Sequence, residues 1–403
     1  FTQYLPWQAV PMLPAELSAG ECSLVVGQDR LAFSCQMQIS PFGDVEEYRF
    51  VKTVINVDDD PHYELALQMA DEGERACSDL RAVSRLLRKR REKGGILELN
   101  MPEAKVEFDK ANEPIRIDQR VQIESMLWIE DCMLITNQCC ALFMKEHKVQ
   151  GIYRIHPPPI PQDITELYSR QPDLFRNTGF SPRALYDIEM GDGEGSAVVP
   201  QLFELFRKLV INAGDDVEKR RMVLRAMQKA RYSTMPQGHF ALSWPDYAHF
   251  TAPIRRYSDL WCHRVMALSI EGRRRRRYKG VEEMAEIISE REIEVMKNER
   301  QGVKLCAVWI VKDRVGELFH GKITGLSEWG MWVELLGTGA EGVVRYESIR
   351  DDWYSYDPEK ERAIGRRKHR FFQRGDALKV QLVRVNLERY ELALEPAEEE
   401  LLG

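Results

Sequence analysis

The stretch YAHFTAPIRRYSDLWCHR, residues Tyr247–Arg264, is the most informative part of this sequence. It predicts a loop that runs into a helix, because Pro253 has the fixed φ suited to a first helical position and Thr251 can cap the helix. Apolar residues then follow at helical spacing. They are Ile254, Tyr257, Leu260, Trp261 and Val265.

Two arginines, Arg255 and Arg256, fall in the first turn of this predicted helix. The helix dipole disfavours cations at that end by roughly 0.3–1 kcal/mol each. Their presence there indicates that an anion binds at the same place. Free N–H groups at a helix start and bidentate guanidinium groups together favour phosphate.

The segment resembles the signature of the ribonuclease II/ribonuclease R (RNB) family, approximately Y-x-H-F-T-S-P-I-R-R-Y-x-D-L-x-x-H-R. Ala252 departs from it, because the family usually has serine there. Other segments stand in family order along almost the whole chain. They are ECSL (Glu21–Leu24), RLAFSCQMQI (Arg30–Ile39), PEAK (Pro102–Lys105), YRIHPPP (Tyr153–Pro159) and KARYS (Lys229–Ser233).

The resemblance implies a magnesium-dependent enzyme that hydrolyses single-stranded RNA processively from its 3′ end and releases nucleoside 5′-monophosphates. It carries a catalytic arginine onto Arg255, which would stabilise negative charge on the scissile phosphate. The competing interpretation of Arg255 is a structural ion pair. Two roles stay open for Arg256, a contact with phosphate and a salt bridge. His249 and Thr251 are expected to touch the RNA backbone, and Tyr257 either joins them or packs inside.

Glu299 is a second catalytic candidate. It shares one stripe of a predicted long helix, residues 281–309, with apolar residues, namely Ile288, Val295, Val303 and Cys306. A buried carboxylate costs several kcal/mol unless paired, so Glu299 should meet an arginine, a metal-bound water or the substrate. The family has a functional glutamate in a matching context. The alternative is a partly exposed helix glutamate.

The resemblance implies an α+β core over residues 1–310, a mixed sheet with packed helices, followed by an S1 RNA-binding domain over residues 311–403. The pattern changes near residue 310 to short alternating strands, and the resemblance to an S1 domain implies a five-stranded OB-type barrel there. Phe33, Cys35, Met37 and Ile39 predict one strand of an earlier hairpin. Further helices are predicted near residues 62–94, 121–147, 162–176 and 197–230.

The S1-like segments are Gly316–Leu335, Glu341–Ile349 and Gly375–Asn386. Trp329 and Trp332 stand where that family places aromatic rings on its RNA-binding face, and a base stacked on such a ring contributes ~1–3 kcal/mol. Alternatively, one tryptophan is in the core. Arg345 is expected to contact phosphate.

Magnesium ligands are not found in the 403 residues, because no D-x-x-x-x-x-D-x-D-D pattern occurs. Two metals need several converging carboxylates, and the resemblance places them upstream of Phe1. Asp58–Asp60 is better explained as a turn and helix cap before Pro61. The ligands are therefore expected in an upstream segment or a second polypeptide. Otherwise the chain is a non-catalytic RNA-binding scaffold.

Composition is compatible with an RNA-binding protein in a reducing compartment such as the cytoplasm. The formal net charge is −7, but residues 231–280 hold ten Lys or Arg against three Asp or Glu. Eight cysteines show no C-x-x-C spacing, and no stretch approaches the ~20 apolar residues that cross a membrane. We expect a monomer with no membrane contact.

Two local features complete the sequence analysis. The run of five arginines at residues 273–277 is most simply a solvated loop between helices. Leu99 stands where an aromatic residue is common in the family.

Overall fold

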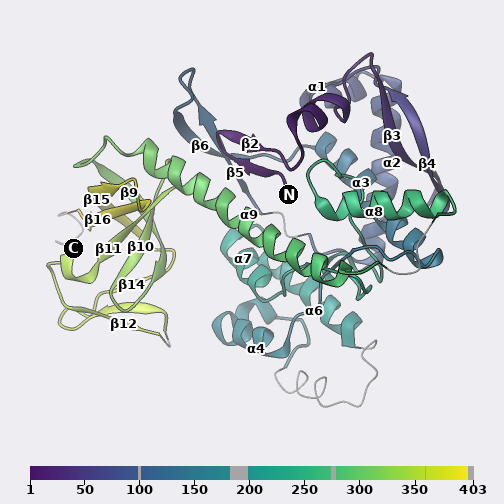
Figure 1. Cartoon of the computed structure of the whole chain (residues 1–403). Coiled ribbons are helices and arrows are strands. Elements are labelled where there is room, and N and C mark those ends of the chain that lie inside the picture. Colours follow the sequence, from purple (N-terminus) through teal and green to yellow (C-terminus); the bar gives the residue numbers. More distant parts are fainter. Residues whose placement is uncertain (99–100, 182–197, 274–277, 359, 398–403) are drawn as a thin grey trace. The chain divides into compact units, whose positions relative to one another are not determined.

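The computed structural model describes residues 1–98, 101–181, 198–273, 278–358 and 360–397 (Figure 1). By packing, the chain forms two compact units. The first comprises Phe1–Thr2, Pro11–Pro102 and Val121–Ile293, and the second comprises Gln3–Val10, Glu103–Arg120 and Glu294–Gly403.

The first unit consists mainly of helices. They are α1 (Tyr63–Asp71), α2 (Arg75–Gly94), α3 (Glu124–Glu146), α4 (Pro161–Arg170), α6 (Val198–Ala213), α7 (Val217–Arg225), α8 (Tyr257–Ile270) and the first part of α9 (Val281–Ile310). Single helical turns lie at Glu16–Glu21, Pro172–Phe175 and Phe240–Leu242. Two antiparallel strand pairs complete the unit: β3 (Asp29–Ile39) with β4 (Val45–Asn56), and β7 (Tyr153–Ile155) with β8 (Arg231–Ser233).

The core of the first unit joins the hairpin β3–β4 to α3 and α8. Phe33, Cys35 and Met37 of β3 pack against this core, as their alternation predicts. Phe50 of β4 is buried there with residues of α3 and α8. A second apolar cluster joins α4, α6 and α7. Both cores follow from periodic apolar residues, since a helix or strand must bury its apolar face against a neighbour.

The second unit contains a closed barrel of five strands with the order β10-β11-β16-β15-β9. The strands are β9 (Leu318–Leu326), β10 (Gly330–Leu335), β11 (Ala340–Arg345), β15 (Ala377–Asn386) and β16 (Glu391–Pro396). A three-stranded sheet of β12 (Tyr354–Asp357), β13 (Arg362–Gly365) and β14 (Phe371–Gln373) accompanies the barrel, with a helical turn at Tyr346–Ser348. Two hairpins belong to the same unit: β1 (Gln3–Leu5) with β2 (Gln8–Val10), and β5 (Glu103–Phe108) with β6 (Pro114–Arg120).

The α+β class and the five-stranded barrel are confirmed. Inside the barrel, alternate residues such as Met331, Val333 and Leu335 are fully buried, which leaves the other residues of each strand facing outward. The predicted boundary between residues 310 and 311 stays a prediction. By packing, the units divide within α9, after Ile293.

Helices α2 and α3 are joined by a buried ion pair. The carboxylate of Asp131 is 1% exposed and accepts hydrogen bonds from the guanidinium of Arg91 and, at 2.6 Å, from the hydroxyl of Ser84. Arg91 is 7% exposed. Removing one partner of such a pair leaves the other charge buried without compensation.

Asp131→Ala should therefore lower the free energy of unfolding by about 3–5 kcal/mol, measured by chemical denaturation. Asp79→Ala on α2 is the matched control, because Asp79 pairs with Arg75 only at the surface and its removal should leave the midpoint unchanged. Equal midpoints for Asp131→Ala and the wild type would contradict the assigned pair.

Candidate nucleic-acid interface

A buried amide, that of Asn137 on α3, helps to position the loop before α8. Its Oδ1 accepts the backbone N–H of Phe250 at 2.8 Å and that of Thr251 at 3.2 Å. Its Nδ2 donates to the hydroxyl of Tyr247 at 3.0 Å. Asn137 is 3% exposed, so these bonds form away from water and hold the loop in one conformation.

Helix α8 begins at Tyr257, so the predicted start at Pro253 is wrong. Residues 252–256 instead form a turn, in which the carbonyl of Ala252 accepts the N–H groups of Arg255 at 3.2 Å and Arg256 at 3.0 Å. The fully buried carboxylate of Asp259 causes this, because it accepts the N–H of Ala252 at 2.8 Å.

The observed start of α8 removes the helix-dipole argument for an anion site, which required Arg255 and Arg256 to lie in the first turn of the helix. Arg255 precedes the helix and Arg256 is its extended N-cap residue, so neither lies in the first turn. The side chain of Thr251 does not cap α8. Its hydroxyl accepts a hydrogen bond from Arg256 Nη2 at 3.4 Å instead.

Arg256 forms a buried salt bridge with Asp259. Its Nε lies 3.0 Å from Oδ2 and its Nη2 lies 2.7 Å from Oδ1, and the side chain is 14% exposed. Burial opposes the charged guanidinium, but the Asp259 carboxylate outweighs it and raises the pKa of Arg256. Of the two alternatives for Arg256, the geometry favours the salt bridge, and an RNA contact stays a prediction.

Arg255 differs from its neighbour. Its side chain is exposed, and within the described part of the chain it has no ion-pair partner. Its backbone is fixed, because its carbonyl accepts the N–H of Thr2 at 3.0 Å. An exposed guanidinium on a rigid turn is suited to contact an anion from solution, which favours this role over a structural ion pair.

His249 is enclosed by cationic groups. Its Nδ1 lies 3.0 Å from the hydroxyl of Tyr232. Burial first, and then the charges of Arg256, Arg154, His239 and Arg255, lower the pKa of His249 well below 6.5. The imidazole is therefore neutral at pH 7, so an RNA contact through it would be a hydrogen bond rather than an ion pair.

Sequence reasoning missed Arg154 on β7 as part of this cluster. Its guanidinium lies over the ring of Tyr232, 4.6 Å from the centroid, and pairs with Glu292 of α9 at 2.5 Å. The sequence did carry a signal for this cluster, because Arg154 lies in the family-like segment Tyr153–Pro159 and Tyr232 lies in the family-like segment Lys229–Ser233. The strand pair β7–β8 brings those segments together.

Tyr257 is 37% exposed and lines a mainly apolar hollow of about 530 Å³ in the first unit. Phe1, Met12, Met284 and Ile287 line the same hollow. Both interpretations of Tyr257, packing and contact with RNA, remain compatible with this position.

Glu299 lies in the second unit, half-buried on α9. Its Oε1 accepts the backbone N–H of Tyr4 on β1 at 3.0 Å. The expected partners were an arginine, a metal-bound water or the substrate, and the partner found is a backbone amide. Of the apolar stripe, Ile288 and Cys306 are buried.

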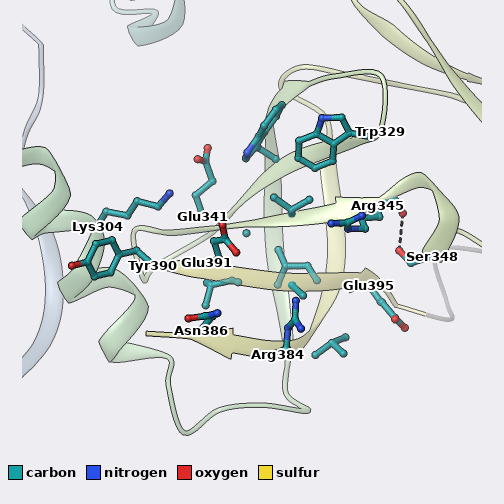
Figure 2. A pocket seen from close by; sticks show the side chains of 17 residues that line it. Lys304, Trp329, Glu341, Arg345, Ser348, Arg384, Asn386, Tyr390, Glu391 and Glu395 are labelled. Carbon is teal, nitrogen blue, oxygen red and sulfur yellow. Dashed lines mark hydrogen bonds between the residues drawn. The ribbon is translucent and has the colours of Figure 1, made fainter. Parts of the chain in front are cut away.

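The second candidate surface is a groove of about 320 Å³ on the barrel (Figure 2). Trp329 and Trp332 both line it, with ring centroids 5.2 Å apart and planes at 72°. Trp329 is 49% exposed and Trp332 is half-buried, so neither ring belongs to the core. The guanidinium of Arg345 lies 5.9 Å from the centroid of Trp329.

The described residues do not supply a magnesium centre. Among them, no group of three or more His, Cys, Asp or Glu side chains is placed to hold a metal ion. Asp58–Asp60 does not cap α1 either, because the cap is His62, whose Nδ1 accepts the N–H of Leu65 at 3.1 Å. Leu99 and residues 274–277 lie outside the described residues.

None of the described helices combines the length and apolar character that spanning a membrane requires.

The low pKa of His249 predicts a pH dependence of stability. The unfolded histidine binds its proton near pH 6.5, whereas the folded one resists it, so acid favours the unfolded chain. The free energy of unfolding should fall as pH drops below 6.5, by at most ~1.4 kcal/mol per pH unit for this group. Denaturation at pH 7, 6 and 5 should show a shallower slope for His249→Gln. Identical slopes would contradict the assignment.

The RNB domain family matches residues 1–272. Ribonuclease R of Aquifex aeolicus is 29% identical over 408 residues, which cover 98% of this chain and 56% of that protein. The chain therefore spans about half the length of the curated relatives it matches.

Two solved structures are similar in fold. Mycoplasma genitalium RNase R in complex with ribose-methylated single-stranded RNA has a TM-score of 0.82 at 23% identity, over 98% of this chain and 62% of that one. Yeast Ssd1, a pseudonuclease, has a TM-score of 0.62 at 15% identity, over 90% of this chain and 44% of that one. Since the family match covers more than half of the sequence, the chain belongs to the RNB domain family.

Proposed function

We propose that this chain is part of an exoribonuclease that shortens single-stranded RNA from the 3′ end and releases nucleoside 5′-monophosphates processively. The observation that carries the proposal is Arg255, an exposed guanidinium without an ion-pair partner among the described residues, on a turn held by buried hydrogen bonds. Family membership and similarity to ribonuclease R support it.

Arg255 would act on the scissile phosphate. Negative charge grows on the non-bridging oxygens during hydrolysis, so a guanidinium already aimed at them stabilises the transition state more than the ground state. Arg256 contributes by holding the turn through Asp259. Thr251 and His249 lie on the same loop and would contact the backbone of the RNA by hydrogen bonds, and Tyr257 would line its path. Glu299, whose observed partner is the backbone N–H of Tyr4, enters the proposal as a catalytic residue through the family resemblance alone.

The barrel would hold the RNA outside the catalytic site. Trp329 and Trp332 offer rings on which bases stack, which contributes ~1–3 kcal/mol for each base. Arg345 would contact phosphate beside them. The conjunction of exposed aromatic rings with a cation in one groove supports this role.

Magnesium belongs to the proposal through the family resemblance alone. The resemblance places the carboxylate ligands in an upstream segment or a second polypeptide, and no group of three or more His, Cys, Asp or Glu among the described residues is arranged to hold a metal ion. The partners in this proposal are therefore single-stranded RNA and the segment that supplies the ligands.

The alternative is an RNB-fold protein that binds RNA without cleaving it. Two observations favour it: the lack of a metal-binding group among the described residues, and the likeness in fold to a pseudonuclease. Activity of the full-length polypeptide separates the two functions. We expect a 5′-labelled RNA with a single-stranded 3′ tail to shorten stepwise from its 3′ end with magnesium and to stay intact with EDTA. Tight binding without shortening would establish the scaffold instead.

Arg255→Ala tests the catalytic assignment. We expect turnover to fall by ~10²–10³ because a transition-state contact is lost, whereas the affinity for RNA measured in EDTA should change little. Arg225→Ala is the matched control, since Arg225 is an exposed arginine at the end of α7 in the same unit. An equal loss of affinity and turnover in Arg255→Ala would mean that this arginine only binds RNA.

A further inference from the structure

The groove on the barrel is electrically balanced, which is unexpected for a surface that holds RNA. Its lining includes three cationic and three anionic side chains. They are Lys304, Arg345 and Arg384, and Glu341, Glu391 and Glu395. Carboxylates repel the phosphates of RNA, so stacking and phosphate contacts alone do not account for them.

The strand register places one of these carboxylates beside an aromatic ring. Trp332 on β10 is the direct partner of Val343 on β11. Alternate residues of a strand share a face, so Glu341 lies on the same outer face as Val343 and is the diagonal neighbour of Trp332. Diagonal neighbours are ~7–8 Å apart, within reach of long side chains. A base stacked on Trp332 therefore lies within reach of Glu341.

Gly325 on β9 makes room for the Trp332 ring, because a Cβ there would come within 3.3 Å of Trp332 Cε3. Val343, the direct partner of Trp332, and its own partner Ala393 on β16 are small apolar residues that also line the groove. The groove of about 320 Å³ has room for a planar group beside these residues.

Glu341 has acceptor capacity left for a ligand. Its Oε1 accepts a hydrogen bond from the hydroxyl of Thr324, its only hydrogen-bond partner among the residues that the structure describes. A carboxylate has about four acceptor sites, so the others remain available. Figure 2 shows Glu341 between Lys304 and Trp329 in this view of the groove.

Two acceptor oxygens on one rigid group select among bases by their Watson–Crick edges. Guanine presents two neighbouring donors there, N1–H and N2–H. Adenine, cytosine and uracil each place an acceptor beside their donor, and that acceptor would face a carboxylate oxygen. A bidentate contact of this kind discriminates strongly between bases.

We propose that this groove binds a guanine base of single-stranded RNA, stacked on Trp332 and hydrogen-bonded through N1–H and N2–H to the carboxylate of Glu341. The proposal rests on the proposed RNA-binding function and adds a base preference to it. Arg345 and Arg384, which line the same groove, neutralise the phosphates that flank the base.

The experiment measures equilibrium binding of the full chain in EDTA to labelled twelve-nucleotide oligouridines by fluorescence anisotropy. The central position is guanosine, inosine, adenosine or uridine. We expect guanosine to bind about tenfold more tightly than uridine or adenosine. Inosine should lie between them, because it keeps N1–H and lacks the N2 amine. Equal affinities for all four RNAs would overturn the proposal.

Two variants assign the preference to the groove. Glu341→Gln should abolish the advantage of guanosine and leave uridine binding nearly unchanged, since glutamine replaces one acceptor by a donor. Glu347→Gln is the matched control, because Glu347 is an exposed carboxylate of the same unit outside the groove, and it should keep the advantage. A guanosine advantage that persists in Glu341→Gln would overturn the proposal. Circular dichroism and thermal midpoints of both variants check that the barrel is folded.

The outcome separates this inference from the proposed function. If the full-length polypeptide shortens RNA but shows no guanosine preference, the exoribonuclease stands and the guanine site is wrong. If guanosine binds preferentially and nothing is shortened, the guanine site stands and the catalytic proposal fails. If no RNA binds, both are wrong.

Discussion

The fully buried carboxylate of Asp259 is the interaction on which the candidate site depends. A charge without water around it must be satisfied by donors, and this one receives the N–H of Ala252, the guanidinium of Arg256 and the hydroxyl of Ser258. These contacts close the chain into a turn before α8 and delay the helix to Tyr257. The same contacts commit Arg256 to the interior and leave Arg255 directed to solvent.

The surroundings of that turn explain how two adjacent arginines differ. Arg154 is paired with Glu292 and Arg256 with Asp259, so both charges are compensated within the fold. His249 lies among them and stays neutral, because its burial and then the charges of the neighbouring arginines lower its pKa. Arg255 alone of these three arginines lacks an ion-pair partner among the described residues. A phosphate approaching the turn would therefore find one cation whose charge is not already balanced.

The barrel presents a different electrostatic surface. Its groove combines aromatic rings with equal numbers of cationic and anionic side chains, which favours contacts with bases and sugars over general attraction to the backbone. In our proposal, the exposed turn and the groove therefore contact different parts of the RNA. One surface offers a fixed positive charge, and the other offers stacking and hydrogen-bond acceptors.

Elements governed by local periodicity were predictable from the sequence. The alternation of Phe33, Cys35 and Met37 predicted β3, and alternation after residue 310 predicted short strands, which form the barrel. The family-like segment Tyr247–Arg264 pointed to the loop that carries Arg255, and the S1-like segment Gly316–Leu335 pointed to the tryptophans of the groove. Local spacing therefore determined the element types, because each depends on residues close together in the chain, and the family resemblance supplied the fold class.

Only the tertiary structure decided what the individual side chains do. The start of α8 depends on Asp259 being buried. The low pKa of His249 depends first on its burial and then on nearby charges, among them Arg154, which β7 brings from almost a hundred residues away. Glu341 becomes the neighbour of Trp332 only through the register of β10 and β11. Burial and long-range pairing set the energies of charged groups, and neither is contained in the local spacing of residues.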